Sequence, residues 1–367
     1  MLRRRLPVAL LLVLVACSSQ SVSGSPSPGT PSAPGQSGSV PGGSGTPTAP
    51  PTTSGSLQRV ARFAGAPTGL AVGSDGSIYV SHSLGASPYG PQVVVRYQPS
   101  SGAVTQSRSL PGGQAVFGQG RLVVAGDSVW VLGGAVSTGG GSLYRLDAST
   151  LKLLGSPHVP ARPTAIAATA SGPWVSAGNG VYLFDAATGA LAASVTLPAT
   201  ITHLASDPSG ALLYVTTTGP VGAHGGLPLL ELDAGTGNVL RSIPDVAVAD
   251  LNGASGLAAT DQGVWVTIPT GTMAQYSFYR AGDLHLTTTG RRGGSNALQA
   301  TIAGAALWLV DGAATVRCAD PATGAVLARL SVPKGMHPAA PFVTAPAGVF
   351  AGIYGGLGLI TPPAACG

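Results

Sequence analysis

The sequence predicts an all-β protein: a seven-bladed β-propeller at residues 57–367, whose N-terminal strand closes the last blade, preceded by a disordered tether. Three observations predict this fold. The chain is rich in glycine and poor in charge, an aromatic residue returns every 40–51 residues, and an incomplete group of strands lies at each end of the repeat region. Repeats of about 40–50 residues with several short strands each are typical of β-propellers.

The composition favours strands and turns over helices. Only 8% of the 367 residues are charged, 55 are glycine, and Glu231 is the single glutamate. The net charge of +5 includes Arg3, Arg4 and Arg5 in a predicted leader, and without them 15 basic residues face 13 acidic ones. No basic patch with interleaved aromatic residues remains, so we expect no nucleic-acid partner. Abundant Arg, Ala, Gly and Pro indicate a GC-rich bacterial genome.

The N-terminus predicts export. Three arginines precede an apolar run at residues 6–16, which is too short to span a bilayer comfortably and suits a signal peptide at residues 1–16. The run ends in "LVAC", which resembles a bacterial lipobox. This resemblance implies cleavage before Cys17, lipid attachment to its thiol, and a membrane-anchored protein on the extracytoplasmic face. The alternative is a simple secretory signal with an incidental cysteine.

Residues 17–56 form the predicted tether. After Cys17 the segment is almost entirely Ser, Gly, Pro and Thr. Such a composition buries too little apolar surface to offset chain entropy, so we expect it to stay disordered and to hold the folded domain away from the membrane.

Each predicted repeat carries its aromatic residue in the second of four strands. In the third unit we expect strands at residues 163–169, 174–177, 181–185 and 190–198. The unit around Phe278 fits poorly, because "YRAGDLHLTTTG" lacks the Thr-Gly turn before the outer strand. The repeat-position aromatics are Tyr79, Trp130, Trp174, Tyr214, Trp265, Trp308 and Phe350.

The ends of the repeat region complement each other. Residues 338–362 contain inner strands but no outer strand, whereas "LQRVARFAG" at residues 57–65 reads as an outer strand with nothing before it. We therefore expect the N-terminal strand to complete the last blade. Six blades with a separate N-terminal strand is the alternative.

The segment "ATITHLASDPSGALLYVTTTGP…LLELDAGTGNVLRSIPDV" resembles a YVTN-type propeller repeat, and more loosely NHL and quinoprotein repeats. The resemblance covers residues 65–362 and implies the fold, but such repeats occur in binding proteins, scaffolds and enzymes alike. Quinoprotein repeats suggest pyrroloquinoline quinone. The tryptophan that usually follows the Asp-x-x-Thr-Gly pattern is replaced by small residues such as Ala193, so we expect no cofactor.

Four aspartates share one repeat position, each just before the turn into an outer strand. We interpret Asp147, Asp185, Asp233 and Asp320 as turn residues, because in a ring they would lie too far apart to hold one metal ion. The chain offers no other metal-ligand spacing, so we expect no metal site. Cys318 and Cys366 remain after lipidation of Cys17, and export favours a disulfide between them.

The long loops between second and third strands and between blades predict the binding face. We expect a monomer that binds an unknown protein, a wall polymer or other glycan, or a small molecule at the channel mouth on this face. The alternatives are a metal-dependent lyase or hydrolase, using a pair such as His203 and His337, and an envelope-assembly scaffold; no catalytic residue is assigned. The candidate residues are His82, Tyr89, His203, His224, Asp250, Asn252, Arg291, Arg292, Asn296 and His337.

Overall fold

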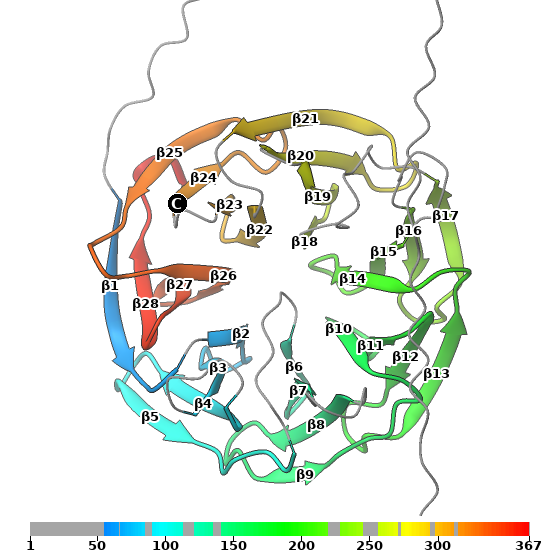
Figure 1. Ribbon diagram of the computed structural model, residues 1–367, viewed down its shortest axis with the longest axis horizontal. Coiled ribbons are helices and arrows are strands. Elements are labelled where there is room, and N and C mark those ends of the chain that lie inside the picture. The colour runs from blue at the N-terminus through cyan, green and yellow to red at the C-terminus, as the bar shows by residue number, and fades with distance from the viewer. Residues whose placement is uncertain are drawn as a thin grey trace, which may run out of the picture. The chain divides into compact units, whose positions relative to one another are not determined.

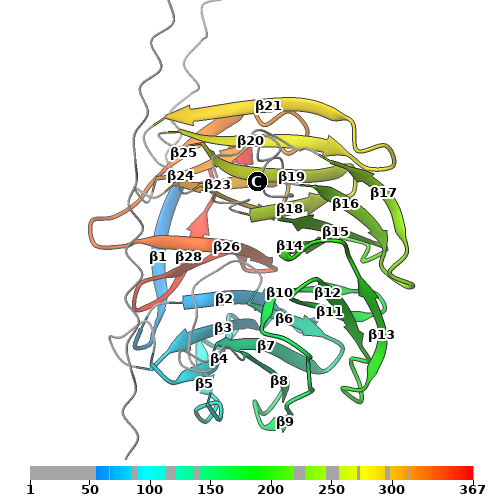
Figure 2. The same ribbon diagram turned by 45° about the vertical axis from the view of Figure 1, so that its right-hand side comes forward.

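Six β-sheets stand around a common axis in the computed structural model of the protein (Figures 1 and 2). The structure describes residues 55–366 except for residues 66, 85–89, 113–120, 135–140, 219–227, 245–255, 271–272, 294–297 and 312–314. The predicted signal peptide, Cys17 and nearly the whole tether lie outside these residues. No helix in the described part is long and apolar enough to cross a membrane.

Five of the sheets have four antiparallel strands that follow one another from the axis to the rim. They are β2 (Pro67–Val72), β3 (Ile78–Ser83), β4 (Gln92–Gln98) and β5 (Ala103–Gln106); β6 (Leu122–Ala125), β7 (Ser128–Gly134), β8 (Gly141–Asp147) and β9 (Leu153–Gly155); β10 (Pro163–Thr169), β11 (Gly172–Ala177), β12 (Gly180–Phe184) and β13 (Leu191–Thr196); β14 (Ile201–Ser206), β15 (Leu212–Thr217), β16 (Leu229–Asp233) and β17 (Val239–Ile243); β18 (Gly256–Thr260), β19 (Gly263–Thr270), β20 (Met273–Arg280) and β21 (Leu286–Gly293). Each of these five four-stranded sheets is a blade of a β-propeller. The prediction of an all-β fold is therefore confirmed.

The sixth sheet has eight strands and joins the two ends of the chain. It contains β22 (Leu298–Ala303), β23 (Ala306–Asp311), β24 (Val316–Ala319), β25 (Val326–Ser331), β26 (Pro338–Ala345), β27 (Gly348–Ile353), β28 (Gly356–Thr361) and β1 (Gly55–Arg62). Strand β1 pairs antiparallel with β28 over six residue pairs and parallel with β25 over two. Residues 55–62 thus lie beside β28 as its outer neighbour, where the sequence predicts a strand at residues 57–65.

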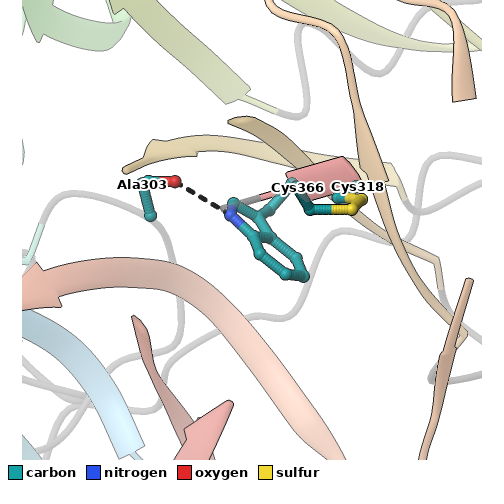
Figure 3. The surroundings of a disulfide bond; sticks show 4 residues. Ala303, Cys318 and Cys366 are labelled. Carbon is teal, nitrogen blue, oxygen red and sulfur yellow. Dashed lines mark hydrogen bonds between the residues drawn. A yellow bond between two sulfur atoms is a disulfide. The ribbon is translucent and has the colours of Figure 1, made fainter. Parts of the chain in front are cut away.

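A disulfide lies at the seam of this sheet. Cys318 on β24 is bonded to Cys366 on the 3₁₀ helix η1 (Ala364–Cys366), with 6.1 Å between their Cα atoms (Figure 3). Both cysteines are buried in one apolar cluster with Leu57 of β1 and Trp308 of β23. The disulfide therefore holds residues 364–366 close to β1.

The Asp-x-x-Thr turns are held by their own side chains. The Asp185 Oδ1 atom accepts hydrogen bonds from the backbone N–H of Ala187 and Thr188 and from the Thr188 hydroxyl, at 2.7–3.1 Å. These bonds favour the charged carboxylate and hold the pKa of Asp185 below its usual value. Asp147, Asp233 and Asp320 bond in the same way within their own turns.

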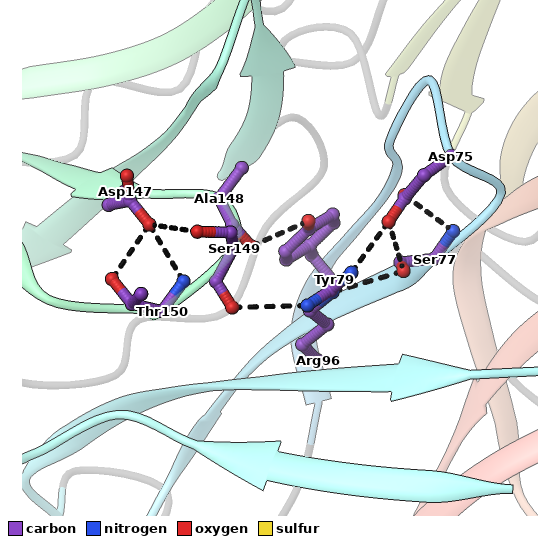
Figure 4. Close-up of polar contacts among 8 residues, drawn as sticks. All are labelled: Asp75, Ser77, Tyr79, Arg96, Asp147, Ala148, Ser149 and Thr150. Atoms are coloured by element: carbon purple, nitrogen blue, oxygen red, sulfur yellow. Dashed lines mark hydrogen bonds and ion pairs between the residues drawn. The ribbon is translucent and has the colours of Figure 1, made fainter. Parts of the chain in front are cut away.

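Aromatic side chains connect one blade to the turn of the next. Trp174 donates from Nε1 to the carbonyl of Ala234, and Trp265 to that of Pro321, both at 2.8 Å. The Tyr79 hydroxyl donates to the Ala148 carbonyl at the same distance (Figure 4). Each acceptor follows the turn aspartate of the neighbouring blade, and each aromatic ring is almost fully buried. We call this contact the aromatic clasp.

The clasps match large residues with small ones. A Cβ atom on Gly237 would lie 2.5 Å from the Val195 side chain and 2.9 Å from the Trp174 ring, and one on Gly324 would lie 2.6 Å from the Trp265 ring. Where the aromatic residue is a smaller tyrosine, leucine occupies the glycine position: Leu151 packs in the cluster of Tyr79, and Leu284 in that of Tyr214.

Leucine at this position adopts an unusual backbone conformation. Leu151 and Leu284 have φ values of 57° and 51°, which glycine adopts far more readily. The turn before β21, which lacks the Thr-Gly sequence, nevertheless keeps its shape. Arg280 pairs with Asp283, and Leu284 fills the space beside Tyr214. Burial of the leucine side chain offsets the backbone strain.

Gly237→Leu tests this size matching. We expect a loss of unfolding free energy of about 2–5 kcal/mol, because the new side chain meets the Trp174 ring and adopts a positive φ. Gly102→Leu is the control. Gly102 has a φ of 69° but no atom within 4 Å of an added Cβ, so it should cost only about 1–2 kcal/mol. Adding Trp174→Tyr to Gly237→Leu should recover part of the loss in denaturant unfolding. Equal losses at Gly237 and Gly102 would contradict size matching.

Candidate functional site

The innermost strands line an axial channel. Strands β2, β6, β10, β14, β18, β22 and β26 lie nearest the axis (Figure 1). Their sequences are rich in alanine, threonine and glycine, as in "GLAAT" of β18 and "LQATIA" of β22. Small side chains on converging strands leave space at the centre of a ring.

Two adjoining cavities occupy the channel. The outer cavity has a volume of about 710 Å³ and lies at the C-terminal ends of the inner strands, with Thr169, Ser206, Asp207 and Thr344 in its wall. The inner cavity has a volume of about 250 Å³. Ser206, Ala259 and Ile302 line both cavities, so the two spaces are neighbours along the axis.

The wall of the inner cavity is mostly apolar, and His203 is its one titratable side chain among the described residues. Besides Ser206 and Thr301, the other wall residues are Leu70, Leu122, Val123, Ala165, Leu204, Leu257, Ala258, Ala259, Ala300, Ile302 and Pro341. A cavity with apolar walls and a few polar groups is the usual form of a small-molecule site.

A strand irregularity accompanies His203. The pairing of β14 with β15 shifts register between Ile201 and His203, and the Thr202 hydroxyl bonds to the Thr216 hydroxyl at 2.8 Å. Comparable shifts and hydroxyl pairs occur at Thr68 with Ser81 and at Thr164 with Ser176. A register shift with a hydroxyl–hydroxyl hydrogen bond therefore occurs near the start of several inner strands. Such bulges change the direction of neighbouring side chains.

His203 is neutral at neutral pH. Burial lowers the pKa of His203 to about 4, and the positive charge of Arg121 lowers it further in the same direction. The Nδ1 atom of His203 has no hydrogen-bond partner within the described part of the chain. Arg121, which directly precedes the wall residue Leu122, has a pKa lowered to about 10 by burial and by the charge of Arg162. Arg121 therefore stays protonated at neutral pH.

The predicted site residues occupy different surroundings. His203 lines the inner cavity, but His82 is fully buried on β3. Its ring stacks on Phe63 with 4.6 Å between centroids, and Nδ1 lies 2.8 Å from the Ser83 carbonyl oxygen. Burial lowers the pKa of His82. His82 is therefore a core residue, and its predicted place on a solvent-facing loop is wrong.

The remaining predicted residues do not form one site in the described structure. His337 is exposed in the loop before β26, and no described contact joins it to His203. The backbone of Arg291 and Arg292 belongs to β21, where these residues pair with Gln275 and Ala274. Tyr89, His224, Asp250, Asn252 and Asn296 lie outside the described residues.

The outer cavity lies toward the face opposite the one that the sequence predicts, whereas the inner cavity lies deeper, beside the first and middle residues of the inner strands. The outer cavity includes the turn at residues 207–210, which joins the first and second strands of its blade, whereas the prediction placed the site among the loops of the other face. Much of those loops lies outside the described residues. The signal for the channel was the recurrence of small residues in the first strand of each unit.

No metal centre is evident in the described part of the chain. No group of three or more His, Cys, Asp or Glu side chains converges there. The turn aspartates each satisfy their own backbone and lie in separate blades, so they form no common site.

Comparisons with known proteins report on the fold. No family model and no curated protein sequence matches the chain. Among solved structures, a chain of hydrazine synthase from Kuenenia stuttgartiensis is similar, with a TM-score of 0.61 and 14% sequence identity, covering 82% of this chain and 96% of that one. At this identity the likeness shows a β-propeller and carries no information on chemistry.

The titration of His203 gives a testable pH dependence. Its folded-state pKa of about 4 lies below the usual 6.5, so the unfolded chain binds the proton more tightly. Neutral His203 therefore contributes roughly 3 kcal/mol to the unfolding free energy. This contribution is fully present above about pH 6.5 and is lost as the pH falls toward 4. His203→Gln should remove this loss, because glutamine does not titrate. Unfolding free energies of both proteins from pH 7 to 4 measure the difference, and identical pH profiles would contradict the assignment.

Proposed function

We propose that this protein is a lipid-anchored, extracytoplasmic β-propeller that binds a small molecule in its axial channel. The observation that carries the proposal is the pair of adjoining cavities on the axis, the inner one apolar apart from His203 and two hydroxyl residues. Together they have the size of an ordinary ligand site. Binding a protein or a wall polymer would instead use an outer face.

The proposal includes a ring of seven blades with YVTN-like repeats. Strands β22–β25 make one blade, and β26, β27, β28 and β1 make another. The two-residue parallel contact between β25 and β1 is short beside the six pairs between β1 and β28, which supports a division of the eight-stranded sheet at that point. Counting these two with the five separate sheets gives seven.

Binding is favoured over catalysis by the surroundings of His203. General acid–base catalysis by a pair of groups requires both within reach of the substrate. The inner cavity has His203 as its one titratable wall residue in the described chain, and His337 is exposed elsewhere. A metal-dependent lyase or hydrolase therefore has less support, as does a pure assembly scaffold, which would not need an axial cavity.

Thr301→Phe tests the proposed site. The neutral fluorescent probe N-phenyl-1-naphthylamine should bind the wild-type protein with one-site stoichiometry and a rise in fluorescence. Thr301 is a half-buried wall residue of the inner cavity, so phenylalanine should fill the space and weaken binding about tenfold or more. Thr196→Phe, on the exposed face of β13, is the matched control and should bind as the wild type does. Absence of binding, or equal effects of both variants, would contradict the function.

Cys17→Ala tests the anchor. Two acyl chains hold a protein stably on a membrane, so removing their attachment site should release the protein into the soluble fraction. Membrane fractionation with metabolic labelling by a fatty-acid analogue measures this. Labelled Cys17→Ala protein that stays with the membrane would show that another segment provides the anchor.

A further inference from the structure

The polar side chains of the inner cavity are not used by the described part of the protein. Elsewhere on the inner strands, hydroxyl groups bond to the neighbouring strand, as Thr164 does to Ser176 and Thr202 does to Thr216, both at 2.8 Å. Within the described chain, no hydrogen bond reaches the side chains of three wall residues: His203, Ser206 and Thr301. Enclosed polar groups without partners cost free energy until a ligand or water bonds to them.

We propose that the inner cavity binds an uncharged apolar molecule of one or two fused rings that carries one hydroxyl group, and that this hydroxyl bonds to His203. The inference rests on the proposed function and adds the chemical class of the ligand. Three properties of the wall carry it: the charge of its side chains, its volume and the position of the histidine.

The wall of the inner cavity favours an uncharged ligand. None of its described residues is Asp, Glu, Lys or Arg, and Arg121 precedes the wall residue Leu122 without being part of the wall. Burial lowers the pKa of His203 to about 4, so the histidine is neutral as well. An ionised group inside such a wall would lose its hydration without gaining a counter-charge.

The volume and the apolar contacts set the size of the ligand. An apolar cavity of about 150 Å³ accommodates benzene. The inner cavity, at about 250 Å³, therefore has space for one or two fused rings. Leu70, Leu122, Leu204 and Leu257 contribute apolar side chains to its wall from four different inner strands.

His203 determines which polar group the ligand carries. Its Nδ1 atom is enclosed and has no partner among the described residues, so Nε2 is the ring nitrogen that can meet a molecule in the cavity. A neutral imidazole presents either an N–H or a lone pair at Nε2, depending on its tautomer. A hydroxyl group can donate or accept and so fits both tautomers, whereas a carbonyl oxygen fits only the N–H.

Three naphthalene compounds test the ligand class. Naphthalene, 2-naphthol and 2-naphthoate share one ring system, and at neutral pH only 2-naphthoate is charged. Displacement of N-phenyl-1-naphthylamine from the wild-type protein gives the dissociation constant of each compound. We expect 2-naphthol to bind about three- to tenfold more tightly than naphthalene, which is the usual effect of one hydrogen bond. 2-Naphthoate should bind about tenfold or more weakly than 2-naphthol. Equal affinities for naphthalene and 2-naphthol, or tightest binding of 2-naphthoate, would overturn the inference.

His203→Leu tests the assignment of the hydrogen bond. Leucine offers no hydrogen-bonding atom, so the preference for 2-naphthol over naphthalene should disappear, while naphthalene should still bind within about twofold of the wild type and so report a folded cavity. His203→Gln keeps a hydrogen-bonding group and should keep part of the preference. His158→Leu is the matched control, because His158 is exposed and lines neither cavity, and it should keep the full preference.

The outcomes separate this inference from the proposed function. A preference for 2-naphthol that survives His203→Leu but is lost in Thr301→Val would overturn the role of His203. Binding of N-phenyl-1-naphthylamine without any preference among the three compounds would overturn the ligand class while leaving the small-molecule site intact. Failure of N-phenyl-1-naphthylamine to bind would overturn the proposed function itself.

Discussion

The burial of an aromatic side chain between neighbouring blades is the constraint on which the ring depends. At Tyr79, Trp174 and Trp265 the side chain also donates a hydrogen bond to the backbone turn of the next blade. Within the described chain, Trp130 and Tyr214 are buried without such a bond, and Trp308 donates to Ala303 of its own blade. The turn aspartate shapes the acceptor, because its carboxylate holds the N–H groups that would otherwise lack partners. The turn residue with a positive φ is glycine beside Trp174 and Trp265, and leucine beside the smaller Tyr79 and Tyr214.

Much of the fold could be predicted because it repeats locally. The aromatic spacing and the turn aspartates mark successive blades. The sequence predicts an N-terminal outer strand at residues 57–65, and the observed strand beside β28 is residues 55–62. Where the repeat-position aromatic residue is tyrosine instead of tryptophan, the facing turn carries leucine instead of glycine. This correlation could not be predicted from one turn alone. It depends on residues of two different blades, such as Tyr79 and Leu151, which are distant in the chain and meet only in the ring.

The candidate site was less predictable for a related reason. A cavity arises where small residues of several inner strands converge, and no single strand shows it. The sequence predicts His203 at the channel mouth among the long loops, whereas it lies on β14 beside apolar walls. His82 lies on β3, the second strand of its blade, and its buried ring stacks on Phe63 in the link after β1, so it does not reach the axis. The two histidines therefore differ because His203 lies on an inner strand and His82 on a second strand.

The fold and the proposed site are connected through the inner strands. Small residues on these strands leave a channel on the axis, and His203 lines its inner cavity. The most direct measurement is a crystal structure of the protein soaked with N-phenyl-1-naphthylamine. The account predicts probe density in the inner cavity, beside His203 and Thr301. Probe density confined to the loops or the rim, with an empty channel, would contradict it.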